Sequence, residues 1–171
     1  MGRTALQDLR SVGDPLQQYN WDVIIPNIPG SGDGRLLTFK AMSTSIPGFM
    51  LEEVPVRIRG YELRFAGTPN WSHSWQVTFL ETRDISTRNL LLNWKRLARD
   101  WETNSGSYKA VYATTMQLVL YDDIPQVAQT IYMNGAFPQT VDDSAIDGAT
   151  SGAVTTGCTF SYDYTSETAG Q

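Results

Sequence analysis

Strict alternation of apolar and polar residues is the feature of this sequence that most limits the folds open to it. In "WSHSWQVTF", Trp71, His73, Trp75, Val77 and Phe79 fall on one side of an extended chain, with Ser, Gln and Thr on the other. Three later segments, residues 112–121, 126–133 and 153–164, alternate in the same way. We therefore expect a mainly β protein, a β-sandwich or half-barrel of two antiparallel sheets.

Two further strands are predicted near the N-terminus. "YNWDVIIPNI" places Trp21, Val23 and Ile25 on one side before Pro26 stops the strand. The glycine-rich "NIPGSGDG" reads as a loop, after which "RLLTFKAM" alternates again through Leu37, Phe39 and Ala41. We expect these segments to form a strand pair joined by that loop.

One flanking α-helix is predicted over residues 84–104. Leu90, Trp94, Leu97 and Trp101 recur at spacings of four, three and four, which gathers them on one stripe of a helix. Asp84 or Ser86 is the expected N-terminal cap, and Gly106 lies just beyond the end. Much of the remaining helix surface is basic, because it carries Arg88, Lys95, Arg96 and Arg99. Such a surface is either simply solvated or a docking face.

The apolar positions change parity within "EEVPVRIRGYELRF". They are even-numbered from Val54 to Ile58 and odd-numbered from Tyr61 to Phe65. Because successive side chains of a strand point to opposite faces, we expect the two halves to bury against different surfaces, with Gly60 at the bend. A plain β-bulge explains the same letters.

Charge and cysteine content narrow the classes of function. The formal net charge is -5, yet every Lys and Arg lies at or before Lys109, and the last 62 residues carry seven acids. Such a surface repels polyanions, so sequence-specific DNA binding is not expected. The single cysteine, Cys158, excludes an intrachain disulfide and alternates in step with core residues. We expect neither a leader peptide nor a membrane span.

Groups for catalysis are scarce in this sequence. The only histidine, His73, is expected to be a half-buried strand residue, and the neighbouring serines point to the other face. Adjacent acids such as Glu52/Glu53 and Asp142/Asp143 are expected to be solvated, and no phosphate-binding loop or dinucleotide fingerprint is present. We therefore predict no catalytic, cofactor-binding or metal-binding residues, no cofactor and no enzymatic activity. Polar strand faces and unsatisfied strand edges indicate controlled assembly instead.

The motifs occur in an order that resembles the tail tube proteins of contractile-tailed bacteriophages. The resemblance runs from Tyr19 to Tyr164 through "YNWDVII", "FKAMSTSIPG", "EEVPVRIRG", "RFAGTPNWSHSWQVTF", "NLLLNWKRLA", "MNGAFPQTV" and "TFSYDY". Related tubes occur in type VI secretion and in pyocin-like particles.

The resemblance implies a virion component assembled in the cytoplasm of the host bacterium. Homo-hexameric rings would stack into a hollow tube, with the inner strands of neighbouring subunits joined into a continuous β-barrel. The implied partners are the tail sheath, the baseplate or tube initiator, the tail terminator and a tape measure protein in the lumen. DNA would pass through without specific binding, and no stable membrane insertion is implied.

Within a single domain of residues 1–171, the resemblance assigns a role to each segment. Residues 1–18 would be an N-terminal arm, 42–69 a candidate inter-ring loop or hairpin, 84–104 the helix, and 165–171 a C-terminal tail. The basic helix face is the candidate sheath contact. The alternatives are a tube subunit of a bacteriocin-like, injection or type VI system, a tube initiator or terminator, and a carbohydrate-binding β-sandwich using exposed aromatics such as Trp71 and Tyr132.

Overall fold

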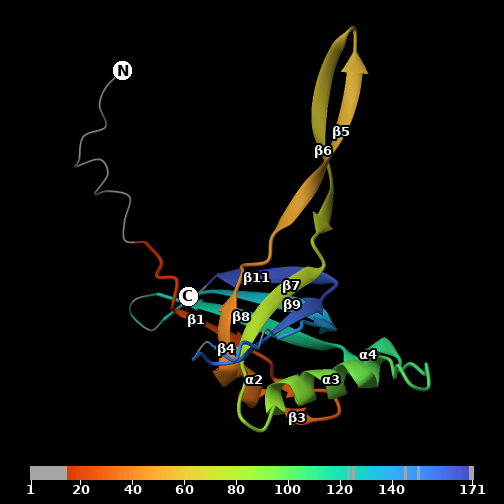
Figure 1. Cartoon of the computed structure of the whole chain (residues 1–171). Helices are drawn as coiled ribbons and strands as arrows, with labels where there is room; N and C mark the ends of the chain where they lie inside the picture. Colours follow the sequence, from red (N-terminus) through yellow and green to blue (C-terminus); the bar gives the residue numbers. More distant parts are fainter. Residues whose placement is uncertain (1–14, 123, 125, 145, 150, 170–171) are drawn as a thin grey trace.

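The chain folds into a strand-rich body from which one long hairpin projects (Figure 1). This computed structural model describes residues 15–122, 124, 126–144, 146–149 and 151–169. The predicted arm at residues 1–18 therefore lies mostly outside the described residues. The first half contains β1 (Trp21–Ile24), β2 (Asn27–Ile28), β3 (Gly32–Asp33), α2 (Arg35–Lys40), β4 (Ala41–Thr44), β5 (Phe49–Ile58), β6 (Tyr61–Trp71) and β7 (Ser74–Leu80). The second half contains α3 (Ser86–Ala98), α4 (Lys109–Tyr112), β8 (Thr114–Tyr121), β9 (Val127–Val141), β10 (Thr155–Ser161) and β11 (Tyr164–Ala169).

The body is built from one strongly bent antiparallel path of strands. The order is β1-β8-β9-β10-β7-β4, and β11 joins the other edge of β9. The first part of β9 pairs with β8 and β11, whereas its last residues pair with β10. The 15-residue strand β9 thus belongs to both layers. The predicted mainly β architecture of antiparallel sheets, open in the single chain, is confirmed.

Gly135 lies where β9 passes from one layer to the other. Its φ of 67° is in the left-handed region, which a residue with a side chain adopts only at a cost. A Cβ atom at this position would lie 2.3 Å from Oδ2 of Asp163, whose side chain also pairs with Lys109. The backbone angle therefore favours glycine at this corner, and a side chain there would have to displace the carboxylate of Asp163.

Aromatic side chains fill the centre of the core. The ring of Phe160 on β10 lies 6.1 Å from Trp75, 6.4 Å from Phe79 and 5.9 Å from Trp94, measured between ring centroids. All four residues are at most 1% exposed. Trp94 belongs to α3, and its indole nitrogen donates to the carbonyl oxygen of Tyr112 at 2.7 Å. The helix thus closes one side of the core, which fixes its place on the sheets.

Most of the predicted strands form, and their buried faces are the predicted ones. Val23 and Ile25, Met116 and Leu118, and Cys158 are buried. The predicted helix forms over Ser86–Ala98, with Trp94 buried, but Trp101 lies beyond its end and is 55% exposed.

The predicted strand pair joined by the glycine-rich loop is wrong, because residues 35–40 form the short helix α2 and β1 pairs with β8. Leu37 is fully buried, whereas Phe39 is 84% exposed. Residues two positions apart lie on nearly opposite sides of a helix, so only one of this pair reaches the core. The alternation in this short segment was therefore misleading.

His73 and the C-terminal segment also differ from expectation. His73 is exposed and lies between β6 and β7 with a φ of 53°, so it is not a half-buried strand residue. Strand β7 begins only at Ser74. Of the predicted tail, residues 165–169 are part of β11, which pairs with β9 from Tyr164↔Asn134 to Ala169↔Gln129. No helix among the described residues is long and apolar enough to cross a bilayer.

Candidate assembly interface

The long hairpin of β5 and β6 is the most conspicuous feature of the surface. Its strands pair only with each other within the described chain, and Figure 1 shows them standing away from the sheets. The turn at the tip has two residues, Arg59 and Gly60, with φ of 50° and 85°. Positive φ at both positions is the type I′ geometry, which matches the twist of the flanking strands. The predicted bend at Gly60 is therefore the turn of a hairpin.

The parity change follows directly from this two-residue turn. Residues on either side of it pair as Ile58↔Tyr61, Val56↔Leu63 and Val54↔Phe65. Each pair joins an even to an odd number, so even positions of β5 and odd positions of β6 lie on the same face. The prediction that the two halves bury against different surfaces is wrong. We call this face the apolar strip; it comprises Val54, Val56, Ile58, Tyr61, Leu63 and Phe65.

The apolar strip is open to solvent in the single chain. Tyr61 is 76% exposed, Phe65 53% and Leu63 48%. Large apolar side chains clustered on one exposed face are a mark of an interaction surface in soluble proteins. The strip is therefore a candidate interaction surface.

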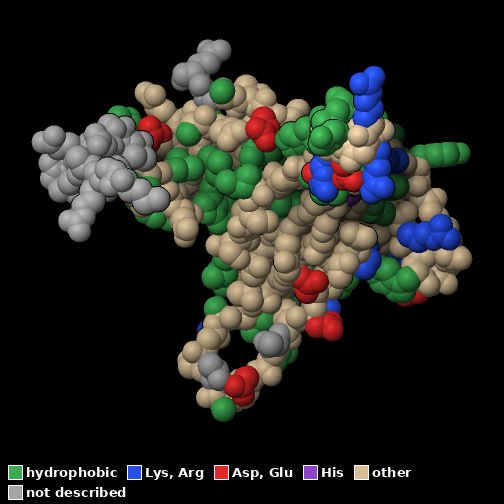
Figure 2. All heavy atoms as spheres, turned by 90° about the horizontal axis from the view of Figure 1, so that it is seen from above, with side chains coloured by type: hydrophobic (Ala, Val, Ile, Leu, Met, Phe, Trp, Pro, Cys, Tyr) green, Lys and Arg blue, Asp and Glu red, His purple; other side chains and the backbone are tan. Residues whose placement is uncertain are grey.

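The opposite face of the hairpin is charged and internally paired. Arg64 contacts Glu53 at 2.6 Å and Glu62 at 3.5 Å, and Arg57 contacts Glu62 at 3.4 Å. Figure 2, which looks down onto the projecting hairpin, shows red and blue side chains gathered beside green ones there. The hairpin is thus amphipathic, with its charges neutralised among themselves.

A bulge near the base gives the hairpin a local change of register. The pairing shifts between Leu51 and Glu53, opposite Gly67. A Cβ atom on Gly67 would lie 2.9 Å from the carbonyl oxygen of Glu52, so the two strands approach closely there. Below the bulge, the rings of Phe49 and Trp71 are 6.2 Å apart.

Hydrogen bonds to the body hold both ends of the hairpin. At the exit, the Ser72 hydroxyl bonds to the Tyr162 hydroxyl at 2.8 Å, and Nδ1 of His73 lies 2.9 Å from the Tyr162 carbonyl oxygen. At the entry, the indole nitrogen of Trp75 donates to the carbonyl oxygen of Ser45 at 2.7 Å. Tyr162 and Trp75 are buried in the core. The direction in which the hairpin projects is therefore tied to the packing of the body.

One sheet surface is mostly polar, and the carboxylate of Asp142 lies on it, 3.3 Å from the side-chain nitrogen of Gln76. The strand positions that alternate with the core residues of β4, β7 and β10 face away from the core. Apart from Leu80, these positions and the paired Thr140 of β9 are small or polar: Ser43, Ser74, Gln76, Thr78, Thr140, Thr155, Gly157, Thr159 and Ser161. We call this surface the polar sheet face.

Glu81 replaces the predicted cap of α3. The residue before the helix, Ile85, has a φ of 51° and provides no side-chain cap, and the acceptor for the N–H groups of Thr87 and Arg88 is neither of the expected residues, Asp84 and Ser86. Instead, the Glu81 carboxylate accepts hydrogen bonds from the backbone N–H groups of Thr87 at 3.1 Å and Arg88 at 2.9 Å. It also accepts from the Thr82 N–H and the Thr156 hydroxyl, both at 3.0 Å.

These bonds determine the acidity of Glu81. Burial raises the pKa of the carboxyl group, but the hydrogen bonds from Thr82, Arg88, Thr156 and Thr87 outweigh it and lower the pKa below the usual 4.5. A negative charge here also meets the positive end of the helix dipole. A sequence scan restricted to residues next to the helix misses this cap, since Glu81 lies five positions before Ser86.

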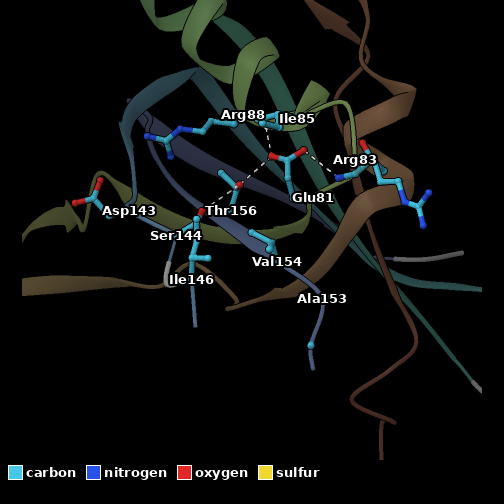
Figure 3. A pocket seen from close by; sticks show the side chains of 12 residues that line it. Glu81, Arg83, Ile85, Arg88, Asp143, Ser144, Ile146, Ala153, Val154 and Thr156 are labelled. Carbon is cyan, nitrogen blue, oxygen red and sulfur yellow. Dashed lines mark hydrogen bonds between the residues drawn. The ribbon is translucent and has the colours of Figure 1, made fainter. Parts of the chain in front are cut away.

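A cavity of about 870 Å³ opens beside Glu81 (Figure 3). Ile85, Ile146 and Val154 contribute apolar side chains, and Arg83, Arg88 and Asp143 contribute charged ones. The Glu81 carboxylate at this cavity is already occupied by its four donors, so it is bound as a structural group. The described residues contain no cluster of three or more His, Cys, Asp or Glu suited to a metal ion.

The basic face of α3 is largely tied to acceptors within the chain. Arg88 donates to the carbonyl oxygen of Asp142 at 3.0 Å, and Arg99 donates to Oδ1 of Asn104 at 2.7 Å. Arg96 pairs with Glu102 at 2.7 Å, and its guanidinium lies 5.2 Å from the centre of the Trp101 ring. The face is a positively charged surface whose geometry is set by local contacts.

The aromatics suggested for sugar binding, Trp71 and Tyr132, are both half-buried. Trp71 ends β6 against Phe49, and Tyr132 lies within β9 between Gln117 and Ser166 of the neighbouring strands. A sugar-stacking platform needs an open ring face. Neither residue has the fully exposed side chain that such a platform would offer.

Comparisons with solved structures identify the fold. The chain is similar to a chain of the anti-feeding prophage (AFP) tube-terminating cap, with a TM-score of 0.68, 12% identity, and coverage of 92% of this chain and 93% of that one. It is also similar to a chain of the PVC sheath–tube complex, an extracellular contractile injection system in the extended state (TM-score 0.64, 15% identity, 98% and 99% covered). A chain of the PVC sheath/tube terminator gives a TM-score of 0.66 at 14% identity over 92% and 99% of the two chains.

Comparisons by sequence add no further relatives. No family model and no curated protein matches the chain. The likeness therefore lies in the fold, which is that of tube and tube-terminator components of contractile injection systems.

Proposed function

We propose that this chain is a structural subunit of the tube of a contractile tail or injection particle. Six copies form a ring, rings stack into a hollow conduit, and a contracting sheath drives the conduit through the envelope of a target cell. The chain is a structural component rather than an enzyme. The observation that carries the proposal is the projecting hairpin, whose apolar strip has no partner within the described part of the chain.

The fold likeness supports this assignment. The similar chains come from assemblies whose names include a tube, a tube terminator and a sheath. The partners proposed here are further copies of the chain, the tail sheath, a baseplate or tube initiator and a terminator. For a phage tail, a tape measure protein and then DNA would occupy the lumen, and the particle would be a virion assembled in the bacterial cytoplasm.

The polar sheet face is the proposed wall of the conduit. A channel that conducts a polyanion must not hold it, and uncharged Ser, Thr and Gln side chains offer no cation to phosphate groups. Among the described strands, β1 and β4 each pair on one side only, and these edges would join those of neighbouring subunits into a continuous β-barrel, which satisfies their remaining backbone groups. The basic face of α3 is the proposed sheath contact.

Assembly of the purified chain tests the proposal. Electron microscopy and light scattering across a concentration series should show rings or hollow tubes. A particle that stays monomeric at all concentrations and ionic strengths would contradict the tube function.

A tube terminator is the second candidate, favoured by the similarity to the AFP tube-terminating cap. A terminator caps a stack made of another protein, so it would form single rings and would not polymerise alone. Rings that never stack, even at high concentration, would therefore favour this candidate over the tube subunit.

A further inference from the structure

The cavity of about 870 Å³ beside Glu81 is apolar in its middle and charged at its two ends. Ile85, Ile146 and Val154 line it and are 52%, 85% and 39% exposed, so the single chain leaves these apolar side chains in water. Figure 3 shows Arg83 and Asp143 at opposite ends of the cavity, with Ile146 and Val154 between them. The cavity thus combines an apolar surface with two separated charges of opposite sign.

The other two charged groups of the cavity already have partners. The Glu81 carboxylate accepts four hydrogen bonds, two of them from the first N–H groups of α3, and Arg88 donates to the carbonyl oxygen of Asp142. By contrast, the side chains of Arg83 and Asp143 have no hydrogen bond or ion pair with another described residue. These two exposed charges are therefore the groups of the cavity that can pair with a ligand.

Ile85 is held beside the cavity at a backbone angle that its side chain opposes. Its φ of 51° lies in the left-handed region, where a β-branched residue is an outlier. Residues strained in this way persist only where the surrounding structure fixes them, and they cluster at binding sites. Because the side chain is half exposed, its burial within the single chain gives little in return for the strain. The combination indicates that Ile85 has a role in binding.

We propose that this cavity binds an extended peptide segment of a partner protein. The segment carries a carboxylate that pairs with Arg83 and a Lys or Arg that pairs with Asp143, and large apolar side chains between them cover the middle of the cavity. An extended chain advances about 3.3 Å per residue, so it can reach both ends, whereas a compact ligand meets only one of the two charges. The inference goes beyond the proposed function, since it holds equally for a tube subunit and for a terminator.

Selection from a displayed library of random peptides of about ten residues tests the binding. The full-length chain is the target, and the variant Ile85→Asn is used for counter-selection. We expect enriched peptides in which an acidic and a basic residue are separated by large apolar residues. Absence of peptides that prefer the parent chain to the variant would overturn the inference. Enriched peptides that match a segment of this chain would identify a second copy as the occupant and would overturn the choice of partner.

Ile85→Asn also separates binding from folding. Asparagine adopts the left-handed region more readily than isoleucine, so the melting temperature should equal or exceed that of the parent chain. The affinity of an enriched peptide, measured by fluorescence anisotropy, should fall roughly tenfold because apolar contact is lost. A lower melting temperature with unchanged affinity would show that Ile85 is a structural residue and would overturn the inference.

A charge exchange tests the polarity of the contact. Arg83→Glu should weaken binding of the peptide roughly fivefold, and replacing the acidic residue of the peptide by Lys should restore it. Arg59→Glu is the matched control, because it changes the net charge equally at the tip of the hairpin, away from the cavity (Figure 1). It should leave the affinity unchanged. Equal losses in both variants, or no recovery with the exchanged peptide, would overturn the pairing with Arg83.

Discussion

Removing the carboxylate of Glu81 is expected to destabilise the chain without altering its assembly surfaces. In Glu81→Ala the N–H groups of Thr87 and Arg88 lose their acceptor at the start of α3, and the Thr156 hydroxyl loses its partner. Loss of a helix cap costs about 1 kcal/mol and up to ~2. Hydrogen bonds to a charged group contribute roughly 1.5–3 kcal/mol each when fully buried.

Because Glu81 is only partly buried, water replaces part of what is lost, and we expect a net cost of about 2 kcal/mol. For a chain of this size that corresponds to a fall of roughly 4–8 °C in melting temperature. The assay is urea and thermal unfolding followed by circular dichroism at a concentration where the chain is dispersed. Glu102→Ala is the matched control, because it removes only an exposed ion pair with Arg96 and should change stability by less than ~1 kcal/mol.

The pH dependence gives an independent check on Glu81. A carboxyl group whose pKa is lower in the folded chain stabilises that chain above the unfolded pKa, near 4.5, and this stabilisation is lost as pH falls through the folded pKa. The difference in stability between parent and Glu81→Ala should therefore be full at pH 7 and shrink below about pH 4. Loss of a cap is expected to cost about 1 kcal/mol or more. If parent and Glu81→Ala differ in their free energy of unfolding by less than about 0.5 kcal/mol at pH 7, the assignment of Glu81 as the cap is refuted.

Three further changes test the corner, the hairpin and the core. Gly135→Ala should destabilise the chain by about 1–3 kcal/mol in urea unfolding, since the φ of 67° and the nearby Asp163 carboxylate both oppose a side chain; an unchanged midpoint would contradict this. Gly60→Val introduces strain at the tip, where φ is 85° but no atom lies within 4 Å of a new Cβ, so ring stacking seen by electron microscopy should suffer more than the melting temperature. Burial raises the pKa of the Cys158 thiol, so a thiol reagent at pH 8 should label it only after unfolding, and rapid labelling of the native chain would show that the core opens.

The alternation of side chains was enough to predict most strands of the body and their buried faces. Each buried strand must place every second residue against the core. The inward orientation of Val77 and Phe79, and of Cys158 and Phe160, can therefore be predicted from their positions in the sequence. The spacing of Leu90, Trp94 and Leu97 was enough to predict a helix, but the side chains that it buries are Thr87, Leu91 and Trp94. The acidic C-terminal part and the single histidine and cysteine likewise come from composition alone.

Contacts between segments that are distant in the sequence determined the helix cap and the conformation of residues 35–40. The cap of α3 comes from Glu81 because the turn before the helix brings that carboxylate back to the first N–H groups, which no rule on adjacent residues anticipates. The short helix α2 forms where alternation predicted a strand, and it is held by burial of Leu37 and by hydrogen bonds of Lys40 to Thr82, Ser86 and Thr87.

The hairpin shows the division between sequence and structure most clearly. The sequence alone showed that apolar residues change parity around Gly60, and it allowed a bend, a bulge or a swapped face. The pairing of Ile58 with Tyr61 decided that both halves share one face, because a two-residue turn pairs positions of opposite parity. The periodicity of the sequence determines which face of its own strand a residue occupies. The register between two paired strands determines which face of one strand lies beside which face of the other, and this register is known only from the folded chain.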